Sequence, residues 1–316
     1  MSHSLALWAV FNLFVIFLLM LDLGVFHKGN KAISIKESLI WSAIWIVVAL
    51  VFNAGVYFWA GPTKALEFLA VYIVERSLSV DNIFVFYLVF VYFKVAAQFQ
   101  YKILFWGIIG ALVMRAVFII AGVALIHQFH WLIYIFGALL VYIGVKLAFE
   151  GDKEIHPEKN PVLTIAKKLF PISYDHENGK FFVKKDGKHF ATSLFLVLLV
   201  VETTDIVFAV DSIPAALAIS LDSFIIYSAN VFAILGLRAL YFALAGCMQL
   251  FKYLQYGLSL VLTFVGVKML LTDFYKIGIG VSLGFIAVVL TISILASLFI
   301  RSKVVVPPVE GQGEAD

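Results

Sequence analysis

Long apolar runs separated by short polar segments dominate the chain. A helix needs about 20 apolar residues to cross a bilayer, and the pattern predicts nine such spans, at residues 5–26, 37–60, 66–93, 98–126, 131–149, 191–220, 223–248, 253–273 and 278–300. The predicted fold class is therefore an all-α polytopic membrane protein, with a transmembrane domain over residues 1–300. A polar, lysine-rich loop at 150–190 is the one long connection, and the tail at 301–316 is expected to be disordered.

Composition agrees with this class. Hydrophobic residues make up 63% of the chain and charged residues 14%, with a mean hydropathy of +1.03, whereas a soluble domain is about half apolar and one quarter charged. The net charge of +3 does not indicate nucleic-acid binding, because most basic residues lie in loops beside the spans. The single cysteine, Cys247, excludes internal disulfides and any centre built from several thiolates. The run from Leu5 to Phe26 has no basic n-region, so we interpret it as a retained helix and not a signal peptide.

The distribution of lysine and arginine predicts the orientation. If successive spans alternate in direction, the loops at 27–36, 94–102 and 150–189, residue 252 and the tail share one side and carry sixteen basic residues. The other side carries only Lys64 and Lys276. Basic residues concentrate in cytoplasmic loops, so the N-terminus is expected outside, and the long loop and the C-terminus in the cytoplasm.

Two similar acidic motifs lie inside apolar runs. They are IVERSLSVDNIF at 73–84, in the run 66–93, and VVETTDIVFAVDSIP at 200–214, in the run 190–220. When Asp81 is aligned with Asp211, Glu75 also falls on Asp205. The two motifs are therefore candidates for an internal repeat.

The similarity continues beyond the motifs. The fourth span carries Arg115 in GALVMRAVFIIAG and the seventh carries Arg238 in AILGLRALYFALAG, while Gly-Val-Lys recurs in the fifth and eighth spans at Lys146 and Lys268. Repeat 1, about 66–149, thus matches repeat 2, about 191–273. Each unit has an odd number of spans, so the second would enter the bilayer from the opposite face. This predicts an inverted repeat of two three-helix units, an arrangement common in secondary transporters with a site near the midplane.

Acidic residues in hydrocarbon are costly unless they are paired, hydrated or ligated, which makes those of the motifs candidates for a functional site. The candidate metal ligands offer only oxygen and amide groups, and they are Glu75, Asp81, Asn82, Glu202, Asp205, Asp211 and Ser212. Oxygen ligands favour a hard divalent ion such as manganese, magnesium or calcium over copper or zinc. Five carboxylates against three intramembrane arginines, Arg76, Arg115 and Arg238, leave net negative charge. A cation is therefore favoured over an oxyanion.

A regular helix cannot aim all of these side chains at one ion. At about 100° per residue, Glu75 and Asn82 share a face of their helix, but Asp81 lies well round it. Pro214 removes a backbone hydrogen bond beside Asp211. We therefore expect a break in the sixth span near 210–214 that would bring the ligands together.

A structural alternative exists for each charged residue, in which carboxylates pair with arginines only to lock helices together. This interpretation is favoured for Arg115 and Arg238, which would neutralise and orient the carboxylates. Glu202 aligns with Tyr72 and has no acidic counterpart in the first motif. Asp22 is interpreted as an interfacial residue. Metal binding by the loop residues His156, Glu158, Asp175, His176 and Glu177 is a further alternative, and a solvated loop is favoured over it.

The motifs VERSLSVDNIFVF, VETTDIVFAVDSIPA, NVFAILGLRALYF and GVKMLLTDFY resemble the TerC family of integral membrane proteins, most closely its Alx-type bacterial members. The resemblance covers the chain from Leu5 to about Ile300. It implies a manganese exporter of the bacterial inner membrane, connected with manganese homeostasis and alkaline pH, and the family name records tellurite resistance. The site positions that it implies are Glu75, Asp81, Glu202, Asp205 and Asp211, with Asn82 and Ser212 beside them.

The leading hypothesis is a secondary transporter that exports Mn²⁺ through one midplane site. An interior-negative potential opposes export of a divalent cation by about 4.6 kcal/mol per 100 mV, so coupling to proton antiport is expected. Carboxylates this close should not all ionise when the site is empty, and Glu202 and Asp205 are the expected proton carriers. No cofactor is expected. The expected partners are the lipid bilayer, the manganese ion and protons, and no nucleic acid.

Two alternatives stay open. One is a membrane scaffold or assembly factor with a structural charged core, whose long loop recruits cytoplasmic partners. The other is a tellurite-resistance factor that acts on an oxyanion. An enzyme is not expected, because neither a soluble domain nor a nucleophile with a paired base is visible in the sequence.

Overall fold

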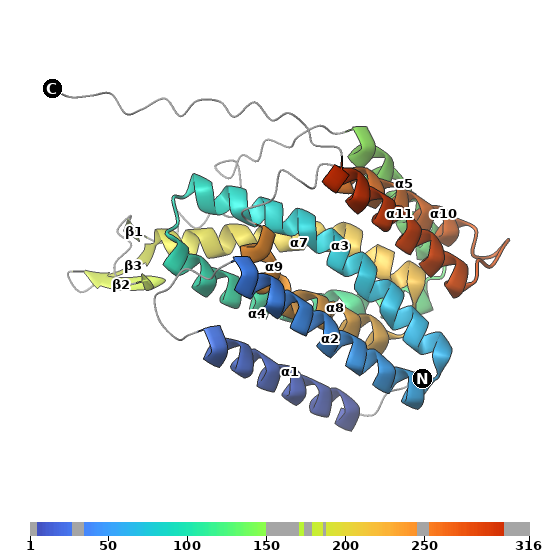
Figure 1. Cartoon of the computed structure of the whole chain (residues 1–316), viewed down its shortest axis with the longest axis horizontal. Helices are drawn as coiled ribbons and strands as arrows, with labels where there is room; N and C mark the ends of the chain where they lie inside the picture. The colour runs from blue at the N-terminus through green and yellow to red at the C-terminus, as the bar shows by residue number, and fades with distance from the viewer. Residues whose placement is uncertain are drawn as a thin grey trace.

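The computed structural model describes residues 5–26, 35–149, 171–173, 179–185, 188–244 and 253–299. Most of it consists of helices that lie roughly side by side (Figure 1). In chain order they are α1 (Leu5–Phe26), α2 (Ile35–Ala60), α3 (Pro62–Tyr92), α4 (Ala97–Gln128), α5 (Leu132–Phe149), α7 (Ser193–Ile219), α8 (Ser223–Leu235), α9 (Leu237–Leu244), α10 (Leu254–Leu270) and α11 (Ile279–Phe299). Helices occupy most of the described part of each predicted span, and the predicted helical, polytopic class is confirmed.

Seven segments of the described chain are long and apolar enough to cross a membrane, and α8 and α9 together form one of them. Apolar side chains cover the outer faces of these helices: Leu13 on α1, Val47 on α2 and Val117 on α4 are each more than half exposed. Such a surface suits contact with lipid. α3 and α10 are not among these seven segments. α3 carries five charged residues, and α10 has only 17 residues. The count of nine spans therefore stays a prediction.

α8 is enclosed by its neighbours, and every residue from Phe224 to Leu235 is buried. It packs against α3, while α4 packs against α7 and α3 also contacts α7. Aromatic rings hold α8 against the first two helices: the ring centres of Phe224 and Phe11 of α1 are 5.3 Å apart, and those of Phe232 and Phe52 of α2 are 4.7 Å apart. The core of the bundle is therefore built around α8, and polar side chains on this helix are shielded from lipid.

Small residues allow α5 and α10 to approach closely. A Cβ placed on Gly137 of α5 would lie 3.0 Å from the carbonyl oxygen of Gly266 in α10, and Ser259 donates to the Gly144 carbonyl at 2.6 Å. Packing through glycine and serine is typical of membrane helices, where apolar burial does not drive association. These two helices would be the third members of the two repeat units. The inverted symmetry of the units stays a prediction.

The predicted break near Pro214 is wrong. α7 continues as an α-helix from Ser193 to Ile219, with Pro214 buried inside it. Membrane helices tolerate proline because neighbouring helices, hydroxyl side chains and small local adjustments compensate for the hydrogen bond that it removes. An interruption is found instead in the next predicted span, at Gly236 between α8 and α9.

A small sheet precedes α7 and was not predicted. Its strands are β1 (Ile172–Ser173), β2 (Phe182–Lys185) and β3 (Lys188–Thr192), in the order β1-β3-β2. β3 pairs parallel with β1 and antiparallel with β2. The start of the sixth apolar run therefore belongs to a strand, and the helix begins at Ser193. A short apolar stretch does not by itself distinguish a strand from the first turn of a helix.

Some predictions fall on residues outside the described ranges. They concern Cys247, the loop residues His156, Glu158, Asp175, His176 and Glu177, most of the loop at 150–190, and the tail at 301–316. The backbone of Asp81 is part of α3, but its side chain also lies outside the description. These predictions are neither supported nor contradicted by the fold.

Candidate functional site

Arg115 of α4 is the centre of a buried polar cluster, and its side chain is only 2% exposed. Its guanidinium donates to Glu75 of α3 and, from Nη1 at 2.6 Å, to Oδ1 of Asn230 in α8. Nη2 lies 3.5 Å from Oδ1 of Asp205 in α7. One arginine therefore connects four helices, and it contacts both carboxylates that the alignment of the motifs superposes.

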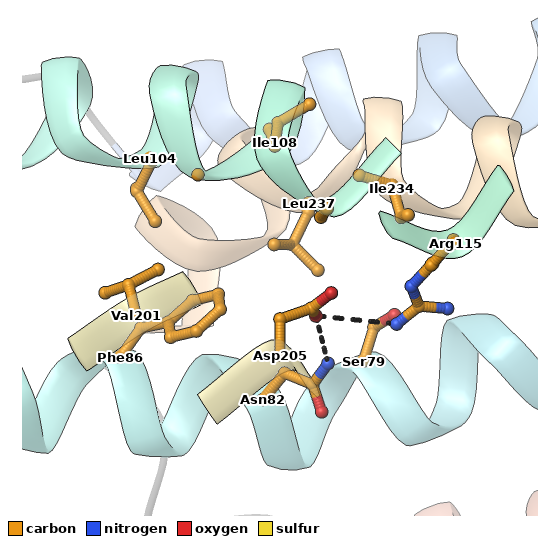
Figure 2. A pocket seen from close by; sticks show the side chains of 12 residues that line it. Ser79, Asn82, Phe86, Leu104, Ile108, Arg115, Val201, Asp205, Ile234 and Leu237 are labelled. Carbon is orange, nitrogen blue, oxygen red and sulfur yellow. Dashed lines mark hydrogen bonds and ion pairs between the residues drawn. The ribbon is translucent and has the colours of Figure 1, made fainter. Parts of the chain in front are cut away.

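Asp205 also joins the two motif helices directly. Nδ2 of Asn82 in α3 lies 3.5 Å from Oδ1 of Asp205, on the oxygen that also faces Arg115 (Figure 2). Asn82 follows Glu75 by seven residues, about two helical turns, so both side chains leave the same face of α3. Both are buried. The shared face that the spacing predicts for these two residues is thus directed into the polar cluster.

A cavity of about 20 Å³ lies beside Asp205. Its polar lining is Ser79, Asn82, Arg115 and Asp205, and the remainder consists of apolar side chains and a glycine from α3, α4, α7, α8 and α9 (Figure 2). A water molecule needs about 10–15 Å³ by this measure. The cavity therefore has room for one or two waters, or for one ion that has lost most of its hydration shell.

Glu202 lies one turn before Asp205 on α7 and is half-buried. Its carboxylate packs against α4 at Gly110, where an added Cβ would lie 2.1 Å from Oε1 of Glu202. Any residue larger than glycine at position 110 would therefore displace this carboxylate. Glu202 and Asp205 both face α4, as residues three apart on a helix do.

The end of the second motif does not reach the cavity. Ser212 is buried and Asp211 is half-buried on α7, and neither belongs to the lining. Within the part of the chain that the structure describes, no three histidine, cysteine, aspartate or glutamate side chains are grouped closely enough to hold a metal ion. The side chain of Asp81 is not part of that comparison. The seven-residue ligand set therefore stays a prediction, and the structure brings Asn82 and Asp205 together, with Glu75 joined to them through Arg115.

Arg238, which the repeat aligns with Arg115, has a different partner. Its guanidinium forms an ion pair with Asp22 of α1, and both side chains are buried. The guanidinium carbon also lies 4.7 Å from the ring centre of Tyr101, within cation–π distance. Arg238 thus neutralises a carboxylate outside both motifs. Asp22, interpreted from the sequence as interfacial, is instead buried.

A second polar network connects the beginning of α3 with the end of α7. Oε2 of Glu67 accepts hydrogen bonds from Lys64 and from Ser220, which follows α7. Nζ of Lys64 also lies 3.8 Å from Oδ2 of Asp222, which caps the N-terminus of α8. The cavity extends from Arg115 in the opposite direction, toward Phe86 of α3. The two motif helices are therefore tied together at one end and enclose the cavity toward the other.

Asn230 is the main site residue that the sequence interpretation missed. It is a lone amide in the apolar segment SFIIYSANVFAIL, and a polar side chain so placed in a membrane span is the signal that could have identified it. The sequence gives a weaker signal for Ser79 and Glu67. Serine is common in membrane helices, and Glu67 lies close to a predicted span end.

Comparison with known proteins identifies the family of this chain. A family model described as "Integral membrane protein TerC family" matches residues 60–304, which include both motifs and the four helices that Arg115 connects. The chain belongs to the TerC family. The predicted resemblance is thereby confirmed, and none of the solved structures gives a significant match to this TerC protein.

Relatives of this TerC protein cover nearly its whole length. It is 49% identical over 300 residues to "Uncharacterized membrane protein STKORF319" of Myxococcus xanthus, which covers 95% of this chain and 94% of that one. It is 42% identical over 306 residues to "Putative membrane-bound redox modulator Alx" of Salmonella typhi, covering 94% and 95% of the two chains. The protein of the same name from Escherichia coli strain K12 is 41% identical with the same coverage. The predicted likeness to Alx-type members is confirmed as well.

Proposed function

We propose that this TerC protein is a secondary transporter that exports a divalent cation, with Mn²⁺ as the expected ion, across the bacterial inner membrane. The observation that carries the proposal is the position of Asp205. Asp205 is 7% exposed, lines a cavity between the two motif helices, and is held by Arg115 and Asn82. An ionisable group so placed in a membrane protein is a candidate for an ion pathway.

The charges around the cavity favour a cation. Glu75 and Asp205 share the single guanidinium of Arg115, and Glu202 lies one turn before Asp205 on α7. This leaves net negative charge when all three carboxylates are ionised. Glu75 is tightly paired, but the contact of Asp205 with Arg115 is long, at 3.5 Å. An incoming cation can therefore take the oxygens of Asp205 without breaking the pair that holds α3 to α4. Carboxylate and amide oxygens suit hard ions such as Mn²⁺.

Proton antiport is the coupling that we propose. In this proposal, Glu202 and Asp205, one turn apart on α7, are the proton carriers of the empty state. A bound cation would displace the proton that they carry, and release of the cation on the outside would let a proton return. This exchange would supply the energy that export of a divalent cation requires against an interior-negative potential.

The helix packing supports a transport cycle with two access states. In an inverted repeat of α3–α5 and α7–α10, α3 is equivalent to α7 and α4 to α8. The contact of α3 with α8 then corresponds to the contact of α7 with α4, and both pairs pack closely. With the N-terminus outside, the cavity lies on the cytoplasmic side of Arg115. The Glu67 network then closes the outer end, so we assign this arrangement to the state loaded from the cytoplasm.

The name of the Alx relatives mentions redox modulation. This chain has one cysteine, so it cannot form an intramolecular dithiol–disulfide pair. An oxyanion substrate, as tellurite resistance would require, is disfavoured by the carboxylates at the cavity. A scaffold role remains the alternative that the transport experiment addresses.

The test is uptake of labelled Mn²⁺ by proteoliposomes with an imposed pH gradient, in competition with Mg²⁺ and Ca²⁺. We expect uptake that stops when the gradient is collapsed, loss of uptake in Asp205→Asn, and normal uptake in Asp273→Asn as an exposed control. Mn²⁺ added to the protein in weakly buffered detergent should release protons at about pH 6 to 8. No cation uptake under any gradient would reject the transporter, whereas uptake without proton release would reject antiport only.

A further inference from the structure

Arg76 follows Glu75 in α3 but has a different direct partner. Whereas Glu75 pairs with Arg115, Nη1 of Arg76 donates to the backbone carbonyl of Ala233 in α8 at 2.9 Å. Its Nη2 atom is buried and has no hydrogen-bond partner among the described residues. Charge pairing with Glu75 therefore does not explain the position of the Arg76 guanidinium.

The carbonyl that Arg76 binds belongs to the last turn of α8. The helix ends at Leu235, and α9 begins after Gly236, whose φ of −82° and ψ of 0° interrupt the regular ladder. The last carbonyls of a helix lack intrahelical partners, and Arg76 supplies one. The guanidinium also occupies the space beside Gly236, because an added Cβ there would lie 2.7 Å from Nη1.

The interruption borders the cavity beside Asp205. Ile234 and Leu237, on either side of Gly236, are both part of the lining (Figure 2). Asn230, one turn earlier on α8, accepts a hydrogen bond from Arg115. The position of the α8–α9 junction therefore sets one wall of the cavity.

We propose that Arg76 is a positioning residue that fixes the α8–α9 junction, and with it the wall formed by Ile234 and Leu237, relative to Asp205. Two adjacent residues of α3 then hold the same stretch of α8. Glu75 does so through Arg115 and Asn230, and Arg76 does so through the Ala233 carbonyl. A shift of α3 during the transport cycle would be transmitted to the cavity wall by this contact.

The interaction requires both a long planar donor and a glycine. Arginine presents several donors in a rigid fork, whereas lysine has one point-like ammonium. Gly236 needs no positive φ, so alanine fits its backbone, and the three atoms nearest to an added Cβ all belong to the guanidinium of Arg76. The pair Arg76→Gln and Gly236→Ala therefore forms a double-mutant cycle on one contact. Gly284→Ala in α11 is a matched control, since an added Cβ there meets nothing within 4 Å.

The first readout does not depend on transport. In a Cys247→Ser background, Leu237→Cys is labelled in detergent with methyl methanethiosulfonate, a small thiol reagent. We expect Arg76→Gln and Gly236→Ala each to change the labelling rate, the double variant to match the larger single effect, and Gly284→Ala to leave the rate unchanged. Arg76→Lys should restore part of the wild-type rate. Independent, additive effects, or no change in Arg76→Gln, would overturn the proposal.

The second readout rests on the proposed function. In proteoliposomes, Arg76→Gln should alter the KM for Mn²⁺ by about ten- to hundredfold, the scale of a displaced binding group, while Arg76→Lys recovers part of it. Wild-type KM in Arg76→Gln would overturn the positioning role. If the wild-type protein moves no Mn²⁺, the transport proposal fails, and the labelling cycle still decides the role of Arg76. If Gly236→Ala does not fold, the comparison of Arg76→Gln with Arg76→Lys decides it.

Discussion

Glu75 and Asp205, which occupy equivalent positions in the two acidic motifs, contact the same guanidinium, that of Arg115. The three side chains come from α3, α7 and α4 and are almost fully buried. One positive charge therefore holds two negative ones inside the bundle. We expect both the stability of the protein and its proposed activity to depend on this shared contact.

Arg115→Ala should destabilise the protein strongly. It would leave the carboxylates of Glu75 and Asp205 buried without their cation, and removal of one partner from a buried ion pair costs about 3–5 kcal/mol. We expect lower abundance and a lower Tm in detergent, with part of the loss recovered when Glu75→Gln is added. The exposed Lys276→Ala serves as the control. An Arg115→Ala protein as stable as Lys276→Ala would contradict the central role of this arginine.

Asp205→Asn should abolish export and keep the fold, because it removes the charge that faces the cavity and preserves the shape of the side chain. Asp211→Asn and Asp81→Asn should have the same effect if the predicted ligand set is complete. Cellular manganese is the measurement: expression of the wild-type protein should lower it and the variants should not. Normal manganese tolerance in any one variant would remove that residue from the site.

Gly110→Ala should impair transport as much as Glu202→Gln does. A methyl group at position 110 would lie 2.1 Å from Oε1 of Glu202, so the carboxylate must move. Gly55→Ala in α2 is the matched control, because an added Cβ there meets nothing within 4 Å. We expect Mn²⁺ uptake to fall in Gly110→Ala and to stay unchanged in Gly55→Ala. Equal uptake by both would show that the position of Glu202 is unimportant.

Arg238→Ala should mainly lower protein abundance. Its buried partner is Asp22 of α1, away from the motifs, so the loss leaves one uncompensated charge in the core. Joint replacement by Asp22→Leu and Arg238→Met should recover stability, since apolar side chains of similar volume often replace a buried pair without cost. The measurement is Tm for the single and double variants. A stable but inactive Arg238→Ala protein would place Arg238 in the transport mechanism instead.

Asp273 should stabilise the loop after α10 in a pH-dependent manner. Hydrogen bonds from Tyr134 and His130 lower the pKa of this exposed carboxyl below its usual range. Its contribution is therefore fully present above the unfolded pKa of about 3.9 and is lost as the pH falls through the lower folded value. The difference in Tm between wild type and Asp273→Asn should persist from pH 7 to 4 and shrink toward pH 3. A difference that grew on acidification would contradict this sign.

The sequence by itself determined the membrane class, the approximate ranges of the helices and the family. These follow from local properties: an apolar run of sufficient length forms a helix in lipid wherever it lies in the fold, because its backbone groups must be satisfied internally. The repeated motifs also identified Glu75 and Asp205 as equivalent positions before any contact was known. Helical spacing placed Asn82 on the face of Glu75 for the same local reason.

Only the tertiary structure decided which charges meet. Arg115 and Arg238 look alike in the sequence, yet one contacts motif carboxylates and the other pairs with Asp22. Likewise, the interruption lies at Gly236 and not at Pro214. Periodicity fixes the face of a helix that carries a side chain, but the rotation and depth of each helix depend on packing against its neighbours. The partners of a buried charge are set by that packing.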